Sequence, residues 1–100
     1  MTISLTLMLL SAASSPFCRP VTQGHSNAVP TAQAAVATAR IAWAGKFSDT
    51  AVKDREPYRA ELSNGTWHVF GTLLPGWRGG TPEAVICASD GKVLKVFHSR

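Results

Sequence analysis

The sequence has few charged residues and lacks any cluster of basic ones. It carries 10 Lys and Arg against 6 Asp and Glu, a formal net charge of +4, and no three basic residues are consecutive. This pattern excludes a polybasic arm for nucleic acid or for a membrane surface. With 100 residues, 45% of them hydrophobic, the chain has the length and composition of one small folded domain.

Recognisable catalytic and metal-binding motifs are also missing. The chain contains no GxSxG, HExxH or CxxC motif, and the glycines of residues 76–80 (GWRGG) lack the strand-to-helix context of a phosphate-binding loop. The best acid/base pair is Glu61 with His68, which has neither a nucleophile nor a third orienting group beside it. His25, His68 and His98 do not have the spacing of metal ligands. We therefore expect no enzymatic activity, no cofactor and no bound metal.

The first residues are typical of an export signal. Residues 1–10 (MTISLTLMLL) form an uncharged apolar run, and residues 11–13 (SAA) supply the small side chains that signal peptidase requires. About ten apolar residues are too few to span a bilayer, for which roughly 20 are needed. The sequence predicts a signal peptide over residues 1–13 and a periplasmic or secreted protein without stable membrane insertion. A lipid anchor on Cys18 is disfavoured, because a proline and a phenylalanine precede it.

Two cysteines are too few for a disulfide framework or a zinc site. After export Cys18 and Cys87 would meet an oxidising compartment, and a bridge between them is left open. Unpaired thiols are favoured, because Cys18 lies in a segment without hydrophobic periodicity. That segment, residues 14–30, mixes Pro, Ser, Gly, Asn and Gln and predicts a flexible linker. The folded domain is therefore expected over residues 31–100.

An amphipathic helix is expected directly after Pro30. Thr31 is a suitable N-cap, and an alanine-rich stretch follows it. Apolar residues recur there at spacings of three or four, which places them on one face of a helix. They are Ala32, Val36, Ala39, Trp43 and Phe47. Gly45 and Ser48 indicate the region in which the helix ends.

A β-hairpin is expected around Asn64-Gly65, a pair that is typical of two-residue turns. With Ser63 opposite Thr66, alternation places Tyr58, Ala60, Leu62, Trp67 and Val69 on the core face. The other face then carries Arg59, Glu61, His68 and Phe70, with Glu61 opposite His68 and Arg59 opposite Phe70.

A second hairpin is expected between residues 83–88 and 92–98. A three-residue loop that ends in Gly91, with this glycine in the left-handed region and a β-bulge, groups the apolar side chains on the core face. These are Ala84, Ile86, Leu94 and Val96, while Glu83 and Lys95 lie outside. The expected fold class is α+β, with one N-terminal amphipathic helix packed on a curved antiparallel sheet of about four strands. A core of about 70 residues is marginal alone, which leaves room for a homodimer or a bound partner.

The loop between the hairpins holds candidates for contact with a partner. Residues 74–81 (LPGWRGGT) place Trp77 and Arg78 among glycines. Large aromatic and guanidinium groups on loops are frequent anchors of protein interfaces. In the other interpretation Trp77 folds back over the end of the core, and the residues alone do not choose between these positions.

Several motifs occur in the order of a known family and at nearly its spacing. They are residues 64–69 (NGTWHV), 71–73 (GTL), 79–82 (GGTP) and 90–94 (DGKVL). On these motifs the stretch from Ile41 to His98 resembles the NTF2-fold immunity proteins that accompany bacterial Rhs-type polymorphic toxins. The resemblance implies a cystatin/NTF2-like fold, in which a helix packs on a curved sheet, and a role as antitoxin.

The leading hypothesis is an exported immunity protein that binds a cognate protein toxin and blocks it by occlusion. The residues expected to contact the toxin are Trp77, Arg78, Arg59, His68 and Phe70. Because inhibitors of basic nucleases are expected to be acidic, the net charge of +4 favours a wall- or membrane-acting toxin with an acidic face. The alternative is a small-ligand-binding or enzymatic domain with its pocket between helix and sheet. Among the residues expected there, only Tyr58 offers a polar group.

Overall fold

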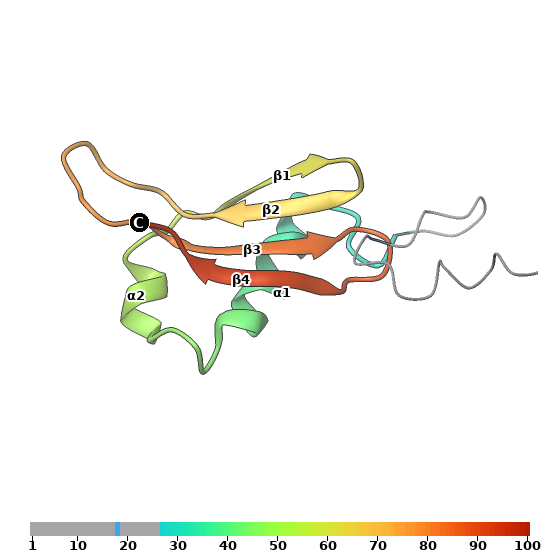
Figure 1. Cartoon of the computed structure of the whole chain (residues 1–100), viewed down its shortest axis with the longest axis horizontal. Helices are drawn as coiled ribbons and strands as arrows, with labels where there is room; N and C mark the ends of the chain where they lie inside the picture. Colours follow the sequence, from blue (N-terminus) through green and yellow to red (C-terminus); the bar gives the residue numbers. More distant parts are fainter. Residues whose placement is uncertain (1–17, 19–26) are drawn as a thin grey trace, which may run out of the picture.

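The computed structural model describes Cys18 and residues 27–100 of the chain (Figure 1). The expected signal peptide, residues 1–13, lies outside the described residues, as does most of the expected linker. Two helices and four strands follow one another: α1 (Ala32–Trp43), α2 (Asp49–Lys53), β1 (Arg59–Ser63), β2 (Thr66–Phe70), β3 (Pro82–Cys87) and β4 (Val93–His98). Among the described residues, no helix has the length and apolar character needed to cross a membrane.

Local signals set both ends of α1. The Thr31 hydroxyl oxygen accepts a hydrogen bond from the Ala34 amide at 3.1 Å, which satisfies one of the free N–H groups of the first turn. The helix ends at Trp43, shortly before Gly45, whose φ of 84° turns the chain away. Phe47 lies beyond the helix and packs against the core from the connection to α2.

The sheet has the strand order β1-β2-β3-β4, and all neighbours are antiparallel. The register of the first hairpin is confirmed, starting with Ser63 opposite Thr66. Asn64 and Gly65 have φ values of 51° and 77°, as a type I′ turn requires. Leu62 was expected in the core but is 53% exposed, because it lies next to the turn on an edge strand.

The second hairpin has a longer connection than the expected three-residue loop. Gly91 has the expected positive φ, 76°, but β3 ends at Cys87 and β4 begins at Val93. The register shift lies within the strands, between Val85 and Ile86, and not at Gly91 as expected.

The amide of Ala88, the residue after β3, donates to the Gly65 carbonyl at 2.9 Å, and its carbonyl accepts from the Val29 amide at 2.9 Å. The backbone of Ala88 therefore bonds to neighbours other than β4.

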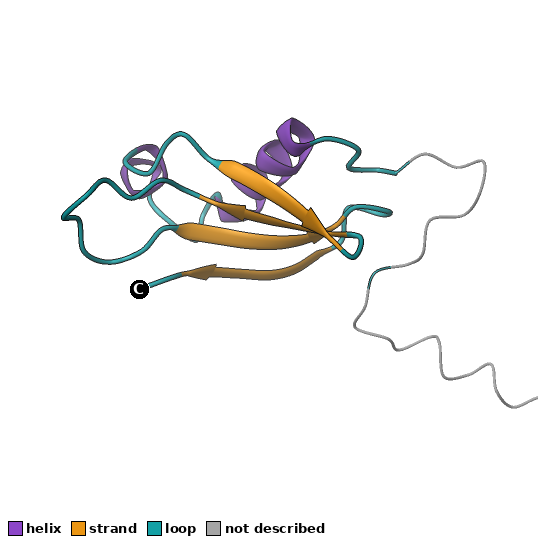
Figure 2. Ribbon diagram, turned by 90° about the horizontal axis from the view of Figure 1, so that it is seen from above, coloured by secondary structure: helices purple, strands orange, loops and turns teal. Residues whose placement is uncertain are grey.

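The core lies between α1 and one face of the sheet, and both helices lie on this side (Figure 2). Trp43, Val69 and Ile86 are wholly buried and fill the space between the two layers. The apolar stripe of α1 is confirmed at Ala39 and Trp43, whereas Ala32 is exposed. The expected fold class, α+β with a helix on a four-stranded antiparallel sheet, is confirmed.

The expectation of unpaired thiols is wrong, because Cys18 and Cys87 form a disulfide. Their Cα atoms lie 5.2 Å apart although 69 positions separate them along the chain. The sulfur of Cys18 also lies 3.6 Å from the hydroxyl oxygen of Thr66, which is the neighbour of Cys87 in the β2–β3 register. The bridge thus ties residue 18 to the turn end of the sheet.

The segment before α1 is held against the same end of the sheet. Ala28 and Val29 donate backbone hydrogen bonds to the β3–β4 turn at 3.0 and 2.9 Å. The side chain of Val29 is buried, and its carbonyl accepts a hydrogen bond from the Trp67 indole nitrogen at 2.9 Å. Residues 27–30, which the sequence places in the linker, therefore pack on the domain. Hydrophobic periodicity does not report such contacts, because backbone groups and one side chain make them.

Candidate functional site

One face of the sheet is left uncovered by the described helices (Figure 2). Side chains alternate along a strand, so every second residue points to this side. The residues on this side form two rows across the four strands: Arg59–Phe70–Glu83–Phe97 and Glu61–His68–Val85–Lys95. We call these eight residues the outer face. Arg59, His68 and Phe70, which the sequence places outside the core, belong to it.

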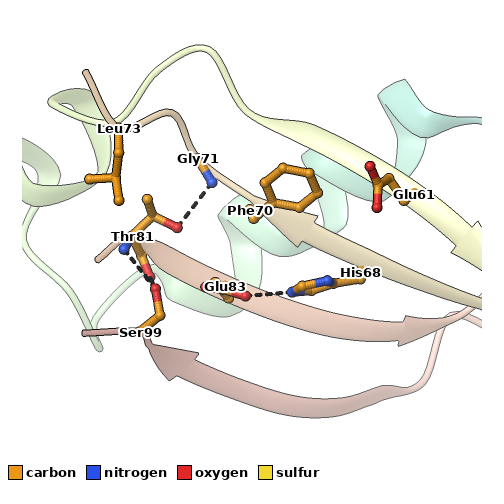
Figure 3. A pocket seen from close by; sticks show the side chains of 8 residues that line it. All are labelled: Glu61, His68, Phe70, Gly71, Leu73, Thr81, Glu83 and Ser99. Carbon is orange, nitrogen blue, oxygen red and sulfur yellow. Dashed lines mark hydrogen bonds and ion pairs between the residues drawn. The ribbon is translucent and has the colours of Figure 1, made fainter. Parts of the chain in front are cut away.

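A hollow of about 320 Å³ opens on the outer face (Figure 3). It is lined by Glu61, His68, Phe70, Gly71, Leu73, Thr81, Glu83 and Ser99. The ring centroids of His68 and Phe70 are 5.3 Å apart, and the carboxylates of Glu61 and Glu83 come from the strands on either side. The hollow therefore combines aromatic surface with negative charge.

His68 pairs with Glu83 and not with Glu61, its expected partner. The Nε2 atom of His68 and the Oε1 atom of Glu83 form a hydrogen-bonded pair, which Figure 3 shows. Glu61 faces His68 from β1, whereas Glu83 approaches it from β3. The Glu83 side chain is 13% exposed against 46% for His68, so the more buried carboxylate orients the imidazole. The sequence does not reveal this partner, because the long β2–β3 loop leaves the register of β3 open.

The hydroxyl groups beside the hollow form hydrogen bonds with the backbone. Ser99 Oγ accepts a hydrogen bond from the Thr81 amide at 3.0 Å. Thr81 Oγ1 accepts from the Gly71 amide and donates to the Pro82 carbonyl, both at 3.1 Å. Both hydroxyl groups are thus engaged with the backbone and not with His68 or Glu83. Among the described residues, no group of three or more His, Cys, Asp or Glu could hold a metal ion.

The β2–β3 loop carries the other two candidates, Trp77 and Arg78. This loop extends past the end of the sheet, near α2 and the C-terminus (Figure 1). Leu73, Leu74 and Trp77 are each between 44 and 56% exposed, and Arg78 is exposed as well. Of the two positions that the sequence left open for Trp77, the structure shows the outward one. Leu73 also lines the hollow, so the loop and the outer face form one continuous surface.

Sequence reasoning missed the exposed leucines and also missed Arg55. The guanidinium carbon of Arg55 lies 4.5 Å from the centroid of the Trp77 ring. The apolar Leu73-Leu74 pair in a loop rich in glycine was a signal for an interaction surface. No comparable signal marked Arg55, because its contacts join segments that are distant along the chain.

The fold and the site define a small α+β domain with one free sheet face and an exposed loop at the end of the sheet. Residues 34–100 match the family of NTF2 fold immunity proteins, and the chain belongs to this family. No curated protein and no solved structure matches the chain.

Proposed function

We propose that this protein neutralises a cognate toxin by binding it and covering the site at which the toxin acts. Family membership supports an immunity function in general. The observation that carries the proposal is the division of the sheet into two faces: α1 covers one, and the other exposes aromatic and charged side chains around a hollow. An inhibitor of this kind needs a complementary surface and no chemistry of its own.

The contents of the core argue against the alternative of a ligand pocket between helix and sheet. Trp43, Val69 and Ile86 occupy that space, and His68 lies on the outer face. The polar group expected there, the Tyr58 hydroxyl, donates a hydrogen bond to the Val52 carbonyl at 2.7 Å. A ligand would therefore have to displace packed side chains and break this bond.

The compartment and the type of toxin are parts of the same proposal. A disulfide between Cys18 and Cys87 suits an oxidising compartment, which supports export to the periplasm or beyond. The family resemblance supports a toxin of the Rhs type. The net charge of +4 favours a toxin with an acidic face, whose binding weakens as salt is added.

A binding and inhibition assay tests the proposal. The oxidised protein is mixed with purified C-terminal toxin domains of Rhs-type proteins, and both the Kd and the residual toxin activity are measured. We expect one domain to be inhibited at equimolar protein, and Phe70→Ala to weaken this binding at least about tenfold. Ile41→Ala is the matched control, because Ile41 is 77% exposed on α1, on the other side of the sheet.

Two results would contradict the proposal. One is that no toxin domain is bound or inhibited even at excess protein. The other is that a toxin domain is bound while its activity stays intact, since occlusion requires that binding and inhibition occur together.

A further inference from the structure

One residue, Arg55, is attached to the β2–β3 loop at three points along residues 71–81. At the start of the loop, the Thr72 amide donates to the Arg55 carbonyl at 2.8 Å. At its end, Arg55 Nε donates to the Gly80 carbonyl at 2.9 Å. Between them the guanidinium group lies over the Trp77 ring, in a cation–π contact. Arg55, two residues after the end of α2, thus contacts the beginning, the tip and the end of the loop.

Both ends of the loop are also packed too closely to shift freely. A Cβ atom on Gly71 would lie 2.8 Å from both the Cβ atom and the carbonyl oxygen of Arg55. A Cβ atom on Gly80 would lie 2.0 Å from the carbonyl oxygen of Ser99. The base of the loop is therefore wedged between the end of α2 and the C-terminal residues.

The composition of the loop indicates what it would meet. Residues 71–81 contain no Asp or Glu, and Arg78 is their one charged residue. Exposed leucine and tryptophan side chains in a single projecting loop mark an interaction site. A projecting apolar surface fits a concave one, and the positive charges of Arg55 and Arg78 favour carboxylates around it.

We propose that Arg55 holds this loop in a preformed conformation and that its tip, Leu73, Leu74 and Trp77, inserts into an apolar cleft of the toxin that is rimmed by carboxylates. The inference rests on the proposed immunity function and adds to it the chemistry of the partner. Arg55 is a positioning residue: it orders the loop before binding, which lowers the conformational entropy lost in the complex.

The first part of the test uses the free protein and needs no toxin. Trypsin cleaves after Arg78, so the rate at which the Arg78–Gly79 bond is cut, followed by mass spectrometry, reports the order of the loop. We expect Arg55→Ala to raise this rate at least about tenfold, and Arg55→Lys to raise it less because the charge is kept. Lys92→Ala, at the opposite end of the sheet, is the control. Equal rates in wild type and both Arg55 variants, at unchanged Tm, would overturn the positioning role.

The second part measures Kd for the toxin domain that the wild type inhibits. We expect Trp77→Ala to weaken binding at least about 30-fold, while Ile41→Ala leaves it unchanged. Arg78→Glu should weaken binding more than Arg78→Ala, because a carboxylate there would face the carboxylates of the cleft. Equal Kd values for these two Arg78 variants would overturn the acidic rim.

The remaining outcomes separate this inference from the proposed function. A toxin that is inhibited equally by wild type and Trp77→Ala overturns the inserted loop and leaves the immunity function standing. A wild type that binds no toxin domain overturns the immunity function and the cleft with it, while the trypsin experiment still decides the role of Arg55. Binding of the wild type, but not of Trp77→Ala, to anionic phospholipid vesicles would assign the loop to a membrane surface and overturn the inference.

Discussion

Removal of the Cys18–Cys87 disulfide should cost this domain most of its stability. The bridge joins residues that are 69 positions apart, so it closes the chain from before α1 to the end of β3 into one loop. In the chain-entropy treatment, a loop of about 70 residues lowers the entropy of the unfolded chain by roughly 15 cal/mol/K, or about 4 kcal/mol at 25 °C. Small domains unfold with a free energy of about 5 kcal/mol or slightly more. The bridge therefore supplies most of the free energy that keeps the protein folded.

Cys18→Ser is the variant that tests this reasoning, because Cys87 is wholly buried and its replacement would also disturb the core. Urea denaturation followed by tryptophan fluorescence yields the free energy of unfolding. We expect Cys18→Ser to lose about 4 kcal/mol relative to the oxidised wild type. With a reducing agent the wild type and the variant should coincide, since both then lack the bridge.

A loss below about 1 kcal/mol would refute the argument from loop closure. It would mean that contacts of the segment before α1 persist in the unfolded chain and already restrict it, or that the bridge opposes other native contacts. A difference between wild type and variant in reducing agent would show that Cys18→Ser acts through something other than the bridge.

Three further predictions concern single contacts. Burial raises the pKa of Tyr58 to about 12, and Tyr58 is the only tyrosine, so tyrosinate absorbance should titrate near pH 12 and not near 10. Because the pKa of Tyr58 is higher in the folded than in the unfolded protein, the free energy of unfolding should fall as the pH rises from 10 to 12. Over this range the wild type should lose at most about 3 kcal/mol more than Tyr58→Phe, which has no phenol group to ionise. Gly80→Ala should lower the free energy of unfolding by at least about 2 kcal/mol in urea, because its Cβ would meet the Ser99 carbonyl; an unchanged midpoint would rule this out. Trp67→Phe should cost about 1–3 kcal/mol, because the Val29 carbonyl loses its indole donor; a smaller loss would mean that water replaces the donor.

The parts of the fold that could be predicted are those set by neighbouring residues. Asn64 and Gly65 form a turn that admits one register, so the pairing of β1 with β2 followed from two residues. In the second hairpin, Gly91 identified the position with positive φ, whereas the length of the connection and the place of the register shift differ from the prediction. Thr31 marked the start of α1. In each case a few adjacent residues determine the geometry.

The parts that could not be predicted depend on contacts between distant segments. The pairing of Cys18 with Cys87 follows from a segment that packs through backbone groups. His68 pairs with Glu83 because of the register between β2 and β3. An 11-residue loop, residues 71–81, separates these two strands along the chain. The role of Arg55 depends on where α2 ends relative to that loop. Local patterns carry no information on any of these three.

The alternation of side chains along β2 places residues of the core and of the outer face next to each other in the chain. Val69 is wholly buried against the helix, while its neighbour Phe70 lines the hollow on the outer face. Because adjacent residues point to opposite sides, Phe70, His68 or Glu83 can be replaced on the outer face while the core keeps its packing. The β2–β3 loop is separate from the core in the same way. Arg55 and the close-packed base of the loop hold its exposed tip, and neither belongs to the core between α1 and the sheet. The outer face and the core are therefore formed by different side chains of the same strands.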